Sequence, residues 1–555
     1  LRKRYLQTKN DIYAAFIEML LSRRAFAGAI GAITSKTFFY TKSQRDLRAL
    51  LSSPETPISL AVDIGPGVLD DAAVETAAYV IWADRPRLHS MFIDLTDSPS
   101  SERSSELRTA TGDPISSRRY LRALNEFSPF PFGAYAYWAP DRVFTLFRSN
   151  ASFEPSYGDV VKGITTFDDF RFCRLTWEVS QESDRWVGIA KGGGYGLFYR
   201  EHEVVVDWLK NGSYLQSHEF AKYDTNARTT QSKIFWFQAG LTFSEVSSIG
   251  FSVQAWPSGR LFGGPGFVIV PHNAADSPAW AAVFNSNYAS SILTLLSTDR
   301  HWSCLSVGRL PVPEFSDECF DQLRCLGGEC IELMSRFGQI SETAREFISP
   351  FVNGQDVCKD FKSAAGVEEQ FWSKTLQDLS LRLTQINSLV NTSARIDGDQ
   401  IGVKVKAFEH ANSLTLDGAI TADSEAVAGP AALPARVVSY LIGAVFGRFQ
   451  SISYNSIEIG VLDQGHSQDL EKLVVQASEQ IGISDDLLRG TIEQMCGDTG
   501  GLRKWIASSF FDWHIKRYSR SRRKAPVYWQ LATPSAAYSI WLYYLLFFLI
   551  VRTNQ

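Results

Sequence analysis

Residues 159–179 read DVVKGITTFDDFRFCRLTWEV and separate two kinds of sequence in this chain. Within them a glycine turn leads into the acidic pair Asp168 and Asp169, and a strand-like run of aromatic and β-branched residues follows. Helix-like and strand-like patterns alternate before this stretch, whereas short strand patterns with glycine-marked turns follow it as far as about residue 315. We therefore predict that an α/β region ends here and that a β-rich domain begins.

The composition is that of a globular, multidomain protein. The chain has 555 residues, which is long enough for three or four domains, and its hydrophobic fraction of 45% is typical of globular proteins. A net charge of −5 excludes a cationic surface over the whole chain, so nucleic-acid contacts must come from local basic patches. The seven cysteines are scattered, which favours a reducing cytoplasm over a disulfide framework. Their one cluster lacks paired C-x-x-C spacing, and we expect helical packing rather than zinc there. That cluster comprises Cys319, Cys325 and Cys330.

The first 95 residues alternate between helical and strand patterns. Apolar residues recur at helical spacing in two segments, and three other segments are short and strand-like. The expected helices are residues 11–21 and 45–51, and the expected strands are residues 28–35, 58–64 and 74–82. This alternation predicts half of a parallel, Rossmann-like sheet, which implies a partner half.

Residues 96–155 are expected to be a linker region. Residues 96–105 are polar and serine-rich, which predicts a surface loop, and residues 118–124 have a helical pattern. The aromatic run FSPFPFGAYAYW at residues 127–138 is expected to pack the linker against its neighbours. A surface that stacks unpaired bases is the alternative.

A β-rich domain is predicted over residues 156–345, and a helical region over residues 346–505. The expected strands are CRLTWEV, RWVGIA, EVVVDWL, KIFWFQ, FSVQAW and FVIV. Apolar residues at three- and four-residue intervals predict helices farther along the chain. Those helices are residues 320–337, 367–390, 435–449 and 470–481, and a loop-rich connection is expected over residues 391–434.

Basic residues of the β-rich domain are candidates for contacts with phosphates. Lys191 precedes three glycines, whose backbone amides can approach a phosphate, and Tyr195 can stack or hydrogen-bond nearby. A flexible turn is the simpler interpretation of this glycine run. Further candidates, each more simply interpreted as a solvated surface charge, are Arg171, Arg228, Lys233 and Arg260.

The densest basic patch lies in the C-terminal segment, residues 506–555. Its cations are interleaved with Tyr518, Tyr528 and Trp529, a pattern suited to phosphate binding with strong salt dependence. Pairing of these cations with acidic neighbours is the structural alternative. The cations are Lys516, Arg517, Arg520, Arg522, Arg523 and Lys524.

Two features are expected to be structural. No D/E-x-K follows the acidic pair at nuclease spacing, so we predict that Asp168 and Asp169 cap or form a turn and hold no metal. The apolar run WLYYLLFFLIV at residues 541–551 is shorter than the ~20 residues that cross a bilayer. A buried element or a truncated end is therefore expected there, and no membrane partner.

Three motifs occur in order in the first region: D-x-Y-x-x-F-x-E, G-x-x-G-x-I-T-S and D-x-G-x-G-V-L-D. Their residues are Asp11, Tyr13, Phe16 and Glu18; Gly28, Gly31, Ile33, Thr34 and Ser35; and Asp63, Gly65, Gly67, Val68, Leu69 and Asp70, before VETAAY at residues 74–79. This order resembles the γ-class amino-methyltransferases that methylate adenine N6 in DNA. The resemblance implies S-adenosylmethionine as cofactor, with Phe16 packing on its adenine. It also implies that Val68 and Leu69 line the pocket for the flipped target base, although ordinary core packing explains these residues equally well.

Later phrases resemble the PglX-type methyltransferases of BREX phage-defence systems and fused restriction-modification enzymes. They are VKGITTFDDFRF (161–172), KGGGYGLFY (191–199), FQAGLTFS (237–244), FNSNYASSIL (284–293), GRLPVPEF (308–315), SRRKAPVYWQL (521–531) and YSIWLYY (538–544). The resemblance implies that the β-rich domain is a target-recognition domain whose partner is double-stranded DNA. A catalytic half on another polypeptide, or other defence proteins, are further partners that it implies.

Two motifs of this family are absent from the sequence: the D-P-x-C-G-S-G cofactor loop and N-P-P-Y. In the family the Asn side chain and a proline carbonyl accept hydrogen bonds from the adenine amino group, and the Tyr stacks on the flipped base. We therefore expect the chain to be the C-terminal part of an adenine-N6 methyltransferase that is inactive alone. A non-catalytic DNA-binding specificity protein is the alternative. An in-frame N-P-P-Y codon run upstream of Leu1 would favour the first reading.

Overall fold

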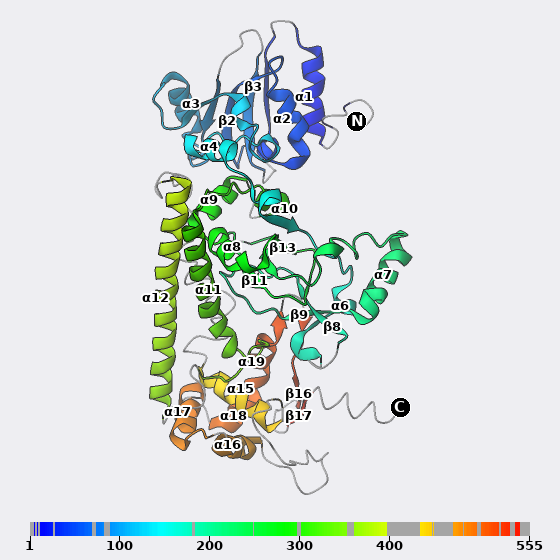
Figure 1. Cartoon of the computed structure of the whole chain (residues 1–555), viewed down its shortest axis with the longest axis vertical. Coiled ribbons are helices and arrows are strands. Elements are labelled where there is room, and N and C mark those ends of the chain that lie inside the picture. The colour runs from blue at the N-terminus through cyan, green and yellow to red at the C-terminus, as the bar shows by residue number, and fades with distance from the viewer. Residues whose placement is uncertain are drawn as a thin grey trace. The chain divides into compact units, whose positions relative to one another are not determined.

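The computed structural model divides into two compact units (Figure 1). It describes the chain except residues 1–4, 6–7, 9–10, 26–27, 69–73, 83–88, 180–183, 248, 297–300, 352–359, 397–432, 447, 449–469, 481, 497–500, 521–522, 533–538 and 544–555. The first unit contains Leu1–Val160, Asn287–Ser316 and Leu389–Lys406, and the second contains the remaining segments.

The first unit is built on a five-stranded mixed sheet. Its strands are β1 (Ile30–Ser35), β2 (Ile58–Gly65), β3 (Thr76–Ile81), β4 (Ser90–Asp94) and β5 (Arg119–Arg122), in the order β1-β3-β2-β4-β5. The three predicted strands are confirmed, but the predicted parallel arrangement is wrong, because only β2 and β4 pair in parallel. β3 is inserted antiparallel between β1 and β2, which therefore run in the same direction.

Helix predictions in this unit succeed where the apolar period is clear. The helices are α1 (Ile12–Arg23), α2 (Arg45–Leu51) and α3 (Arg103–Gly112), so the predicted loop at residues 96–105 ends where α3 begins. The predicted helix at residues 118–124 is wrong. That segment forms β5, which pairs antiparallel with β4, because a free sheet edge offers its backbone a hydrogen-bonding partner that four residues of helix cannot match.

Both faces of this sheet are covered. Neighbouring residues of a strand point to opposite faces. Val62 and Ile93 pack against α3 in one small core. On the other face Phe92 stacks on Tyr137, with ring centroids 5.1 Å apart. Tyr135 and Tyr137 are fully buried, so the aromatic linker packs against its neighbours as predicted.

The second unit contains two small sheets and helices between their strands. One sheet has the order β12-β8-β9-β7 and the other contains β10 between β11 and β13. Their bounds are β7 (Cys173–Leu175), β8 (Trp186–Ala190), β9 (Val204–Asp207), β10 (Gly240–Ser244), β11 (Gln254–Trp256), β12 (Leu261–Phe262) and β13 (Gly266–Pro271). α7 (Leu209–Tyr223) and α8 (Ser277–Phe284) make this region β-rich rather than all-β.

One predicted strand of this region is wrong. KIFWFQ forms the short 3-10 helix η6 (Lys233–Phe235). Ser232 and Phe237, on either side of it, have positive φ values of 55° and 65°, which interrupt an extended backbone. The remaining predicted strands coincide wholly or in part with observed ones.

Helices dominate the rest of the second unit. The predicted helices are confirmed as α11 (Asp317–Gln339), α12 (Phe361–Ala394), α15 (Leu433–Val445) and α16 (Leu470–Gln480). α17 (Asp485–Cys496), α18 (Gly501–Ser508) and α19 (Phe510–Arg517) follow, then the hairpins β14 (Ser519–Arg520) with β15 (Arg523–Lys524) and β16 (Tyr528–Ala532) with β17 (Ser539–Tyr543). Most of residues 391–434 lies outside the described residues. Within the described part of the chain, no helix combines the length and apolarity that a bilayer crossing requires.

Candidate nucleic-acid interface

The C-terminal segment packs onto the stretch that opens the second unit. Trp177 donates a hydrogen bond of 2.9 Å to the carbonyl of Ala525, and its ring meets Tyr518 edge-on with centroids 5.4 Å apart. Arg523 donates two hydrogen bonds to the carboxylate of Glu178. The opening stretch of the second unit and the basic C-terminal segment therefore form one structure.

The acidic pair serves as architecture, as predicted. Asp168 caps the short helix α6 (Asp169–Phe172) by accepting a hydrogen bond of 3.0 Å from the backbone of Arg171. Asp169 accepts hydrogen bonds from Thr166 and from Lys191, at 2.8 Å from the latter. Burial raises the pKa of Asp169, but these hydrogen bonds outweigh burial and lower it below its usual value. Among the described residues, no group of three or more metal-ligating side chains is present.

The glycine run after Lys191 requires glycine for two reasons. Gly192, Gly193 and Gly194 have φ values of 72°, 135° and 92°, a region that side chains disfavour. A Cβ on Gly192 would lie 2.8 Å from the backbone carbonyl oxygen of Pro265, which is closer than real Cβ contacts allow. The amide of Gly194 already donates to Ser244 Oγ at 3.0 Å, and the Lys191 ammonium is paired with Asp169. The run is therefore explained by the backbone conformation and close packing of this turn, and its Gly194 amide and Lys191 ammonium already have partners in the fold.

These elements surround a cavity of about 850 Å³ inside the second unit. Five cations and three carboxylates line it, and the cations come from four separate parts of the sequence. The cations are Arg174, Lys191, Arg200, Lys516 and Arg523, and the carboxylates are Asp169, Glu201 and Glu203. Lys191 is paired with Asp169 and Arg523 with Glu178, so the positive charge that this cavity offers to an anion such as a phosphate group comes mainly from Arg174 and Lys516.

His202 adds no positive charge to this cavity near neutral pH. Its ring is buried and meets Trp256 edge-on, with centroids 4.5 Å apart, and its Nε2 lies 3.0 Å from the carbonyl of Ala255. Burial, with the nearby charges of Arg260 and Arg200, lowers the pKa of His202 to about 3. His202 is therefore a neutral hydrogen-bond donor that supports the wall of the cavity.

The structure divides the predicted DNA-binding residues by exposure. Arg171, Arg228, Lys233, Lys516 and Lys524 are exposed, and Lys191, Tyr195, Arg260 and Arg523 are half-buried. Arg260 lies over the ring of Trp256, 5.6 Å from its centroid. Arg522 and Leu69 lie outside the described residues, as does the side chain of Arg520. Lys191, Lys516 and Arg523 meet at the cavity, whereas Arg228 and Lys233 lie on the segment that carries α7 and η6.

Arg517 does not lie on the surface, although its place in the predicted basic patch required it. Only 3% of it is exposed, and its Nε lies 3.3 Å from Glu342, which is also buried. Glu342 also accepts a hydrogen bond of 2.8 Å from Ser439. At Arg517 the structural alternative is therefore observed: a cation of the predicted basic patch is paired with an acidic neighbour.

Sequence reasoning missed Arg174 and Arg200, although both line the cavity. Arg174 sits in the expected strand CRLTWEV, where alternation places it opposite its buried neighbours Cys173 and Leu175. Arg200 directly follows the phrase KGGGYGLFY. Local pattern therefore identifies each of them as a single charge, but not as part of one cavity.

In the first unit the ends of β1 and β2 meet at one edge of the sheet. Ser35 and Gly65 both pair with Thr76. Lys36 bridges this edge, at 3.2 Å from Asp63 and 3.0 Å from Glu75. Burial lowers the pKa of Lys36, but the carboxylates of Asp63 and Glu75 outweigh burial and raise the pKa above its usual value.

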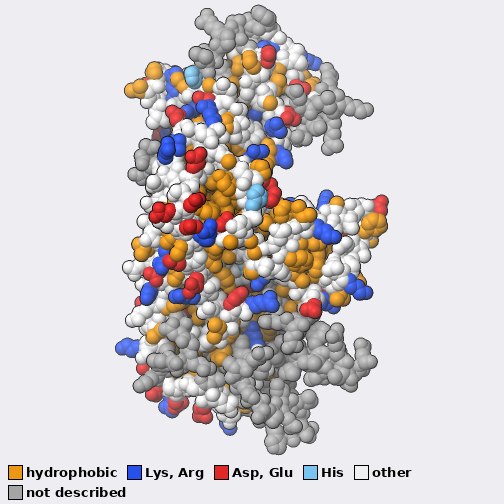
Figure 2. Space-filling view, viewed as in Figure 1, with side chains coloured by type: hydrophobic (Ala, Val, Ile, Leu, Met, Phe, Trp, Pro, Cys, Tyr) orange, Lys and Arg blue, Asp and Glu red, His pale blue; other side chains and the backbone are white. Residues whose placement is uncertain are grey.

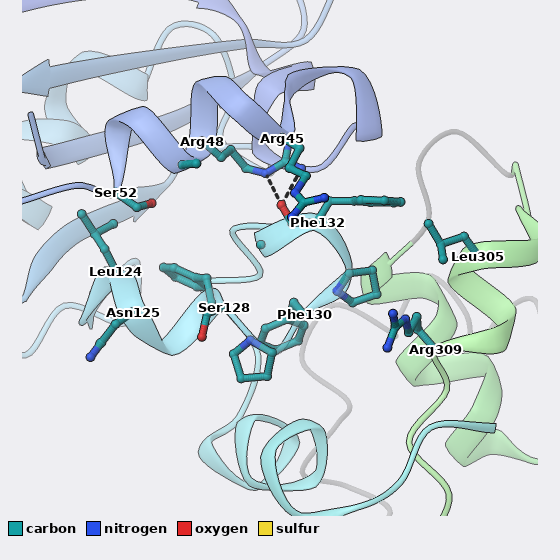
Figure 3. Close-up of a pocket in the computed structure, with 15 residues that line it drawn as sticks. Arg45, Arg48, Ser52, Leu124, Asn125, Ser128, Phe130, Phe132, Leu305 and Arg309 are labelled. Carbon is teal, nitrogen blue, oxygen red and sulfur yellow. Dashed lines mark hydrogen bonds between the residues drawn. The ribbon is translucent and has the colours of Figure 1, made fainter. Parts of the chain in front are cut away.

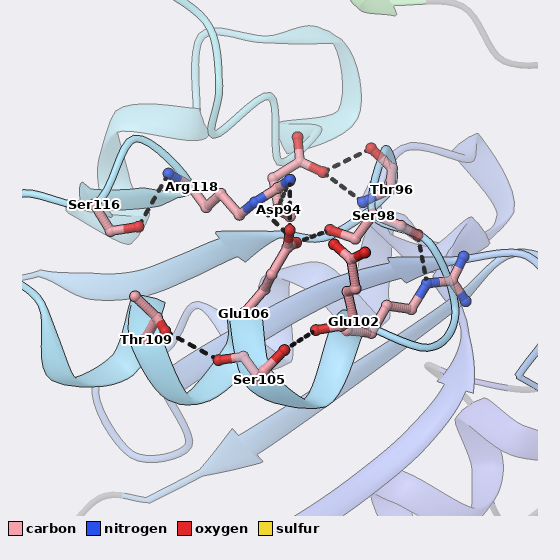
Figure 4. A network of polar contacts seen from close by, with 10 residues as sticks. Asp94, Thr96, Ser98, Glu102, Ser105, Glu106, Thr109, Ser116 and Arg118 are labelled. Carbon is pink, nitrogen blue, oxygen red and sulfur yellow. Dashed lines mark hydrogen bonds and ion pairs between the residues drawn. The ribbon is translucent and has the colours of Figure 1, made fainter.

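A polar network next to this edge joins α3 to the end of β4 (Figure 4). Arg118 pairs with Glu106 of α3 at 3.0 Å and donates to the carbonyl of Asp94 at 3.2 Å. Arg103, also from α3, donates to the carbonyl of Pro66 at 2.8 Å. Val68 is half-buried in the loop after β2.

A second cavity, of about 460 Å³, lies within the first unit beside α2. Figure 3 shows Arg48 reaching from α2 to the carbonyl of Phe132, to which it donates from Nε and Nη2 at 3.1 and 2.8 Å. Arg45 and Arg309 are exposed at this cavity, and no carboxylate stands among its described lining residues. Its charge therefore suits a small anion.

The described residues do not form a site for S-adenosylmethionine on their own. Phe16 is 57% exposed on α1. An exposed aromatic ring can stack on an adenine, but the sequence contains no glycine-rich loop to hold the rest of the cofactor.

Comparisons with known proteins identify relatives. No protein-family model matches the chain. It is 25% identical over 328 residues to the adenine-specific methyltransferase PglX of Lacticaseibacillus casei (strain Zhang), covering 56% of this chain and 27% of the relative. It is 22% identical over 538 residues to the adenine-specific methyltransferase BrxX of Escherichia coli O9:H4 (strain HS), covering 92% and 40%. The chain is thus homologous, at low identity, to these BREX methyltransferases, and it spans well under half of their lengths.

Solved structures were compared as well. A structure of the Type IIL restriction-modification enzyme MmeI in complex with DNA matches 74% of this chain and 54% of its own, with a TM-score of 0.44 and 10% sequence identity.

Proposed function

We propose that this chain, a homologue of the PglX and BrxX adenine-specific methyltransferases, is the DNA-recognising part of a site-specific adenine-N6 DNA methyltransferase. The second unit binds double-stranded DNA, and the first unit supplies the end of the catalytic domain. The whole protein transfers methyl groups from S-adenosylmethionine to a flipped adenine, in phage defence or restriction-modification.

The observation that carries this proposal is the cationic cavity of the second unit. Arg174 and Arg200 lie near the start of the second unit and Lys516 lies near the end of the sequence, yet the fold places them around one space. Cations gathered from separate segments indicate a binding surface rather than local solubility. Phosphates of DNA are the anions that a methyltransferase of this kind must hold while a base leaves the duplex.

The isolated chain is expected to bind DNA without transferring methyl groups, because its sequence contains neither D-P-x-C-G-S-G nor N-P-P-Y. Val68 is proposed to line the space for the extruded base and Phe16 to contact the cofactor in the whole protein. A specificity protein that never methylates is the second candidate, and the same absence of motifs favours it.

Fluorescence anisotropy with a labelled 30-base-pair duplex tests DNA binding by the chain. Affinity is expected to fall steeply between 50 and 200 mM salt, and a variant with Arg174→Gln and Lys516→Gln should bind every duplex sequence more weakly with a smaller salt slope. Absence of duplex binding at 50 mM salt would overturn the proposal. Transfer of radiolabelled methyl groups to DNA distinguishes the two candidates. The gene's full product, and no truncated form, should transfer methyl groups if the protein is a methyltransferase, and no form should do so if it is a specificity protein.

A further inference from the structure

Residues 208–238, called the arm below, carry an unusual surface of exposed apolar side chains. Six of the eighteen large hydrophobic side chains that are exposed in the described part of the chain lie on this one segment. They are Leu209, Tyr214, Phe220, Tyr223, Ile234 and Phe237, with exposed fractions between 38% and 78%. Figure 2 shows hydrophobic and basic side chains together on the projection that carries α7. Exposed apolar patches of this kind mark interaction sites.

Other apolar side chains of the arm are buried in a core. The exposed apolar side chains are therefore not explained by the absence of a core. Trp208 and Leu215 are buried in a small core of the second unit. Trp236 packs against the same core, and its ring meets Trp208 edge-on with centroids 5.1 Å apart. The fold therefore anchors the arm with one set of residues and presents another.

The charged side chains of the arm indicate which kind of partner its exposed apolar side chains contact. Four cations of the arm are exposed, and the carboxylate of Glu219 is fully buried, where it accepts hydrogen bonds from the backbone of Arg228 and Thr229. Asp224 is the arm's one exposed carboxylate, and every arm residue is described. The exposed cations are Lys210, Lys222, Arg228 and Lys233. A surface with this balance favours a polyanion over an acidic or neutral protein face.

Cations and aromatic rings of the arm lie side by side. Lys222 Nζ is 5.3 Å and the guanidinium of Arg228 is 5.9 Å from the ring centroid of Tyr223. The ring of Phe167 lies 5.3 Å from that of Tyr223, at an angle of 36°. An aromatic platform flanked by cations is the combination that binds nucleic-acid bases and their backbone together.

The backbone of the arm is held in an uncommon conformation. Lys210, Asn211, Asp224, Ser232 and Phe237 have positive φ values, five of the nine such non-glycine residues in the described part of the chain. Ser232 is fixed by a hydrogen bond of 2.8 Å to the carbonyl of Lys162. Backbone strain that persists in a well-anchored segment is a mark of a functional surface.

We propose that the arm is a second DNA-contact element, in which Phe220, Tyr223 and Ile234 pack against unstacked bases of a distorted duplex while the neighbouring cations hold phosphates. This inference rests on the proposed DNA binding of the second unit. Extrusion of an adenine requires unstacking of its base pair, and apolar wedges that replace the lost stacking lower the free energy of such a distortion.

The test uses the whole chain and a 30-base-pair duplex containing 2-aminopurine at successive positions. The apolar variant combines Phe220→Ser, Tyr223→Ser and Ile234→Ser. The cation variant combines Lys222→Gln, Arg228→Gln and Lys233→Gln. The matched control replaces Ile348 and Leu381 with serine, since both belong to the second unit and are 65% and 56% exposed.

The two arm variants are expected to fail differently. The apolar variant should bind roughly tenfold more weakly at every salt concentration, with an unchanged salt slope and without the 2-aminopurine fluorescence increase of the parent chain. The cation variant should lower the slope of log affinity against log salt by about 0.9 for each lost phosphate contact. The control should match the parent chain, and all three should unfold at the parent's temperature.

Other outcomes overturn the inference. Parent-like binding and fluorescence by the apolar variant would remove the arm from the DNA interface while leaving the proposed function intact, if the Arg174 and Lys516 variant still loses affinity. Reduced self-association of the apolar variant without a change in DNA binding would assign the surface to a second copy of the chain. A parent chain that binds no duplex would overturn the proposed function and, with it, this inference.

Discussion

Arg523 donates hydrogen bonds from Nε and Nη2 to the two carboxylate oxygens of Glu178, at 2.6 and 2.7 Å. This fork-shaped pairing matches the planar geometry of both groups and is stronger than a single contact. Glu178 also accepts a hydrogen bond of 2.7 Å from the backbone of Leu175. The pair joins the C-terminal hairpin of β14 and β15 to the opening of the second unit, so Arg523 contributes to the fold as well as to the cavity.

Replacement of Arg523 with Met is expected to destabilise the second unit by about 1–3 kcal/mol, because the mostly buried carboxylate of Glu178 would lose its charged partner. Urea unfolding followed by tryptophan fluorescence measures this loss. Lys524→Met is the matched control: Lys524 is adjacent and exposed, so its free energy of unfolding should change by less than about 0.5 kcal/mol. Equal stability of the two variants would contradict a structural role for the pair.

Substitution with Met should have different effects at the adjacent cations Lys516 and Arg517: a change in DNA binding at the first and a loss of stability at the second. Arg517→Met leaves Glu342 as a buried charge without this partner and is expected to cost about 3–5 kcal/mol of stability. Lys516 is exposed at the cavity, so Lys516→Met should keep stability and lower the salt slope of DNA binding by about 0.9. Urea unfolding and anisotropy distinguish them, and a shared loss of DNA affinity without loss of stability would return Arg517 to the surface patch.

Much of the fold was predictable because local periodicity fixes helices and strands. The pattern at residues 45–51 predicted α2 with the bounds that it has, and the long helices α11 and α12 followed from their apolar spacing. Strand direction was not predictable in the same way. β3 inserts antiparallel between β1 and β2, a choice made by contacts between distant segments that no local pattern records.

The cationic cavity was only partly predictable. The basic C-terminal run was recognisable as a patch, but the division between Lys516 and Arg517 depends on Glu342, far earlier in the chain. A local signal did exist: Phe510, His514 and Arg517 recur at helical spacing and share the buried face of α19. Arg174 and Arg200 meet Lys516 only through tertiary packing, so sequence alone identifies them at best as isolated charges.

Acid should destabilise the second unit through His202. Its folded pKa of about 3 lies below the unfolded value of about 6.5, so the unfolded chain binds a proton that the folded chain does not. Stability is therefore constant above pH 6.5 and falls by about 1.4 kcal/mol per pH unit between pH 6.5 and 3 from this group alone. Burial also lowers the pKa of His514 well below its usual value, which adds to the loss of stability as the pH falls below about 6.5.

Replacement of His202 with Gln tests this pH dependence, because Gln keeps a donor toward the carbonyl of Ala255 and does not titrate. Urea unfolding at pH 7.5, 6.5, 5.5 and 4.5 should show a shallower loss of stability for the variant, by about 1.4 kcal/mol per pH unit. An unchanged slope would mean that His202 becomes protonated in the folded protein.

Arg48 is expected to hold the linker of the first unit in place. It is 1% exposed, and it donates to the carbonyls of Phe38, Thr41 and Phe132, at distances between 2.7 and 3.1 Å. Burial lowers the pKa of Arg48 to about 10, so the group remains charged at neutral pH. Arg48→Met removes all of these donors and leaves buried carbonyls without them, which should cost about 2–4 kcal/mol.

Arg45→Met is the control for this change, since Arg45 lies one turn earlier on α2 and is exposed. Thermal unfolding should show a transition of the first unit several degrees lower for Arg48→Met and unchanged for Arg45→Met. Phe132 has a positive φ of 59°, which Arg48 stabilises through the carbonyl of the same residue, so hydrogen exchange at residues 130–134 should accelerate only in the Arg48 variant. Parallel effects of both substitutions would show that charge at the cavity, rather than these hydrogen bonds, maintains the loop.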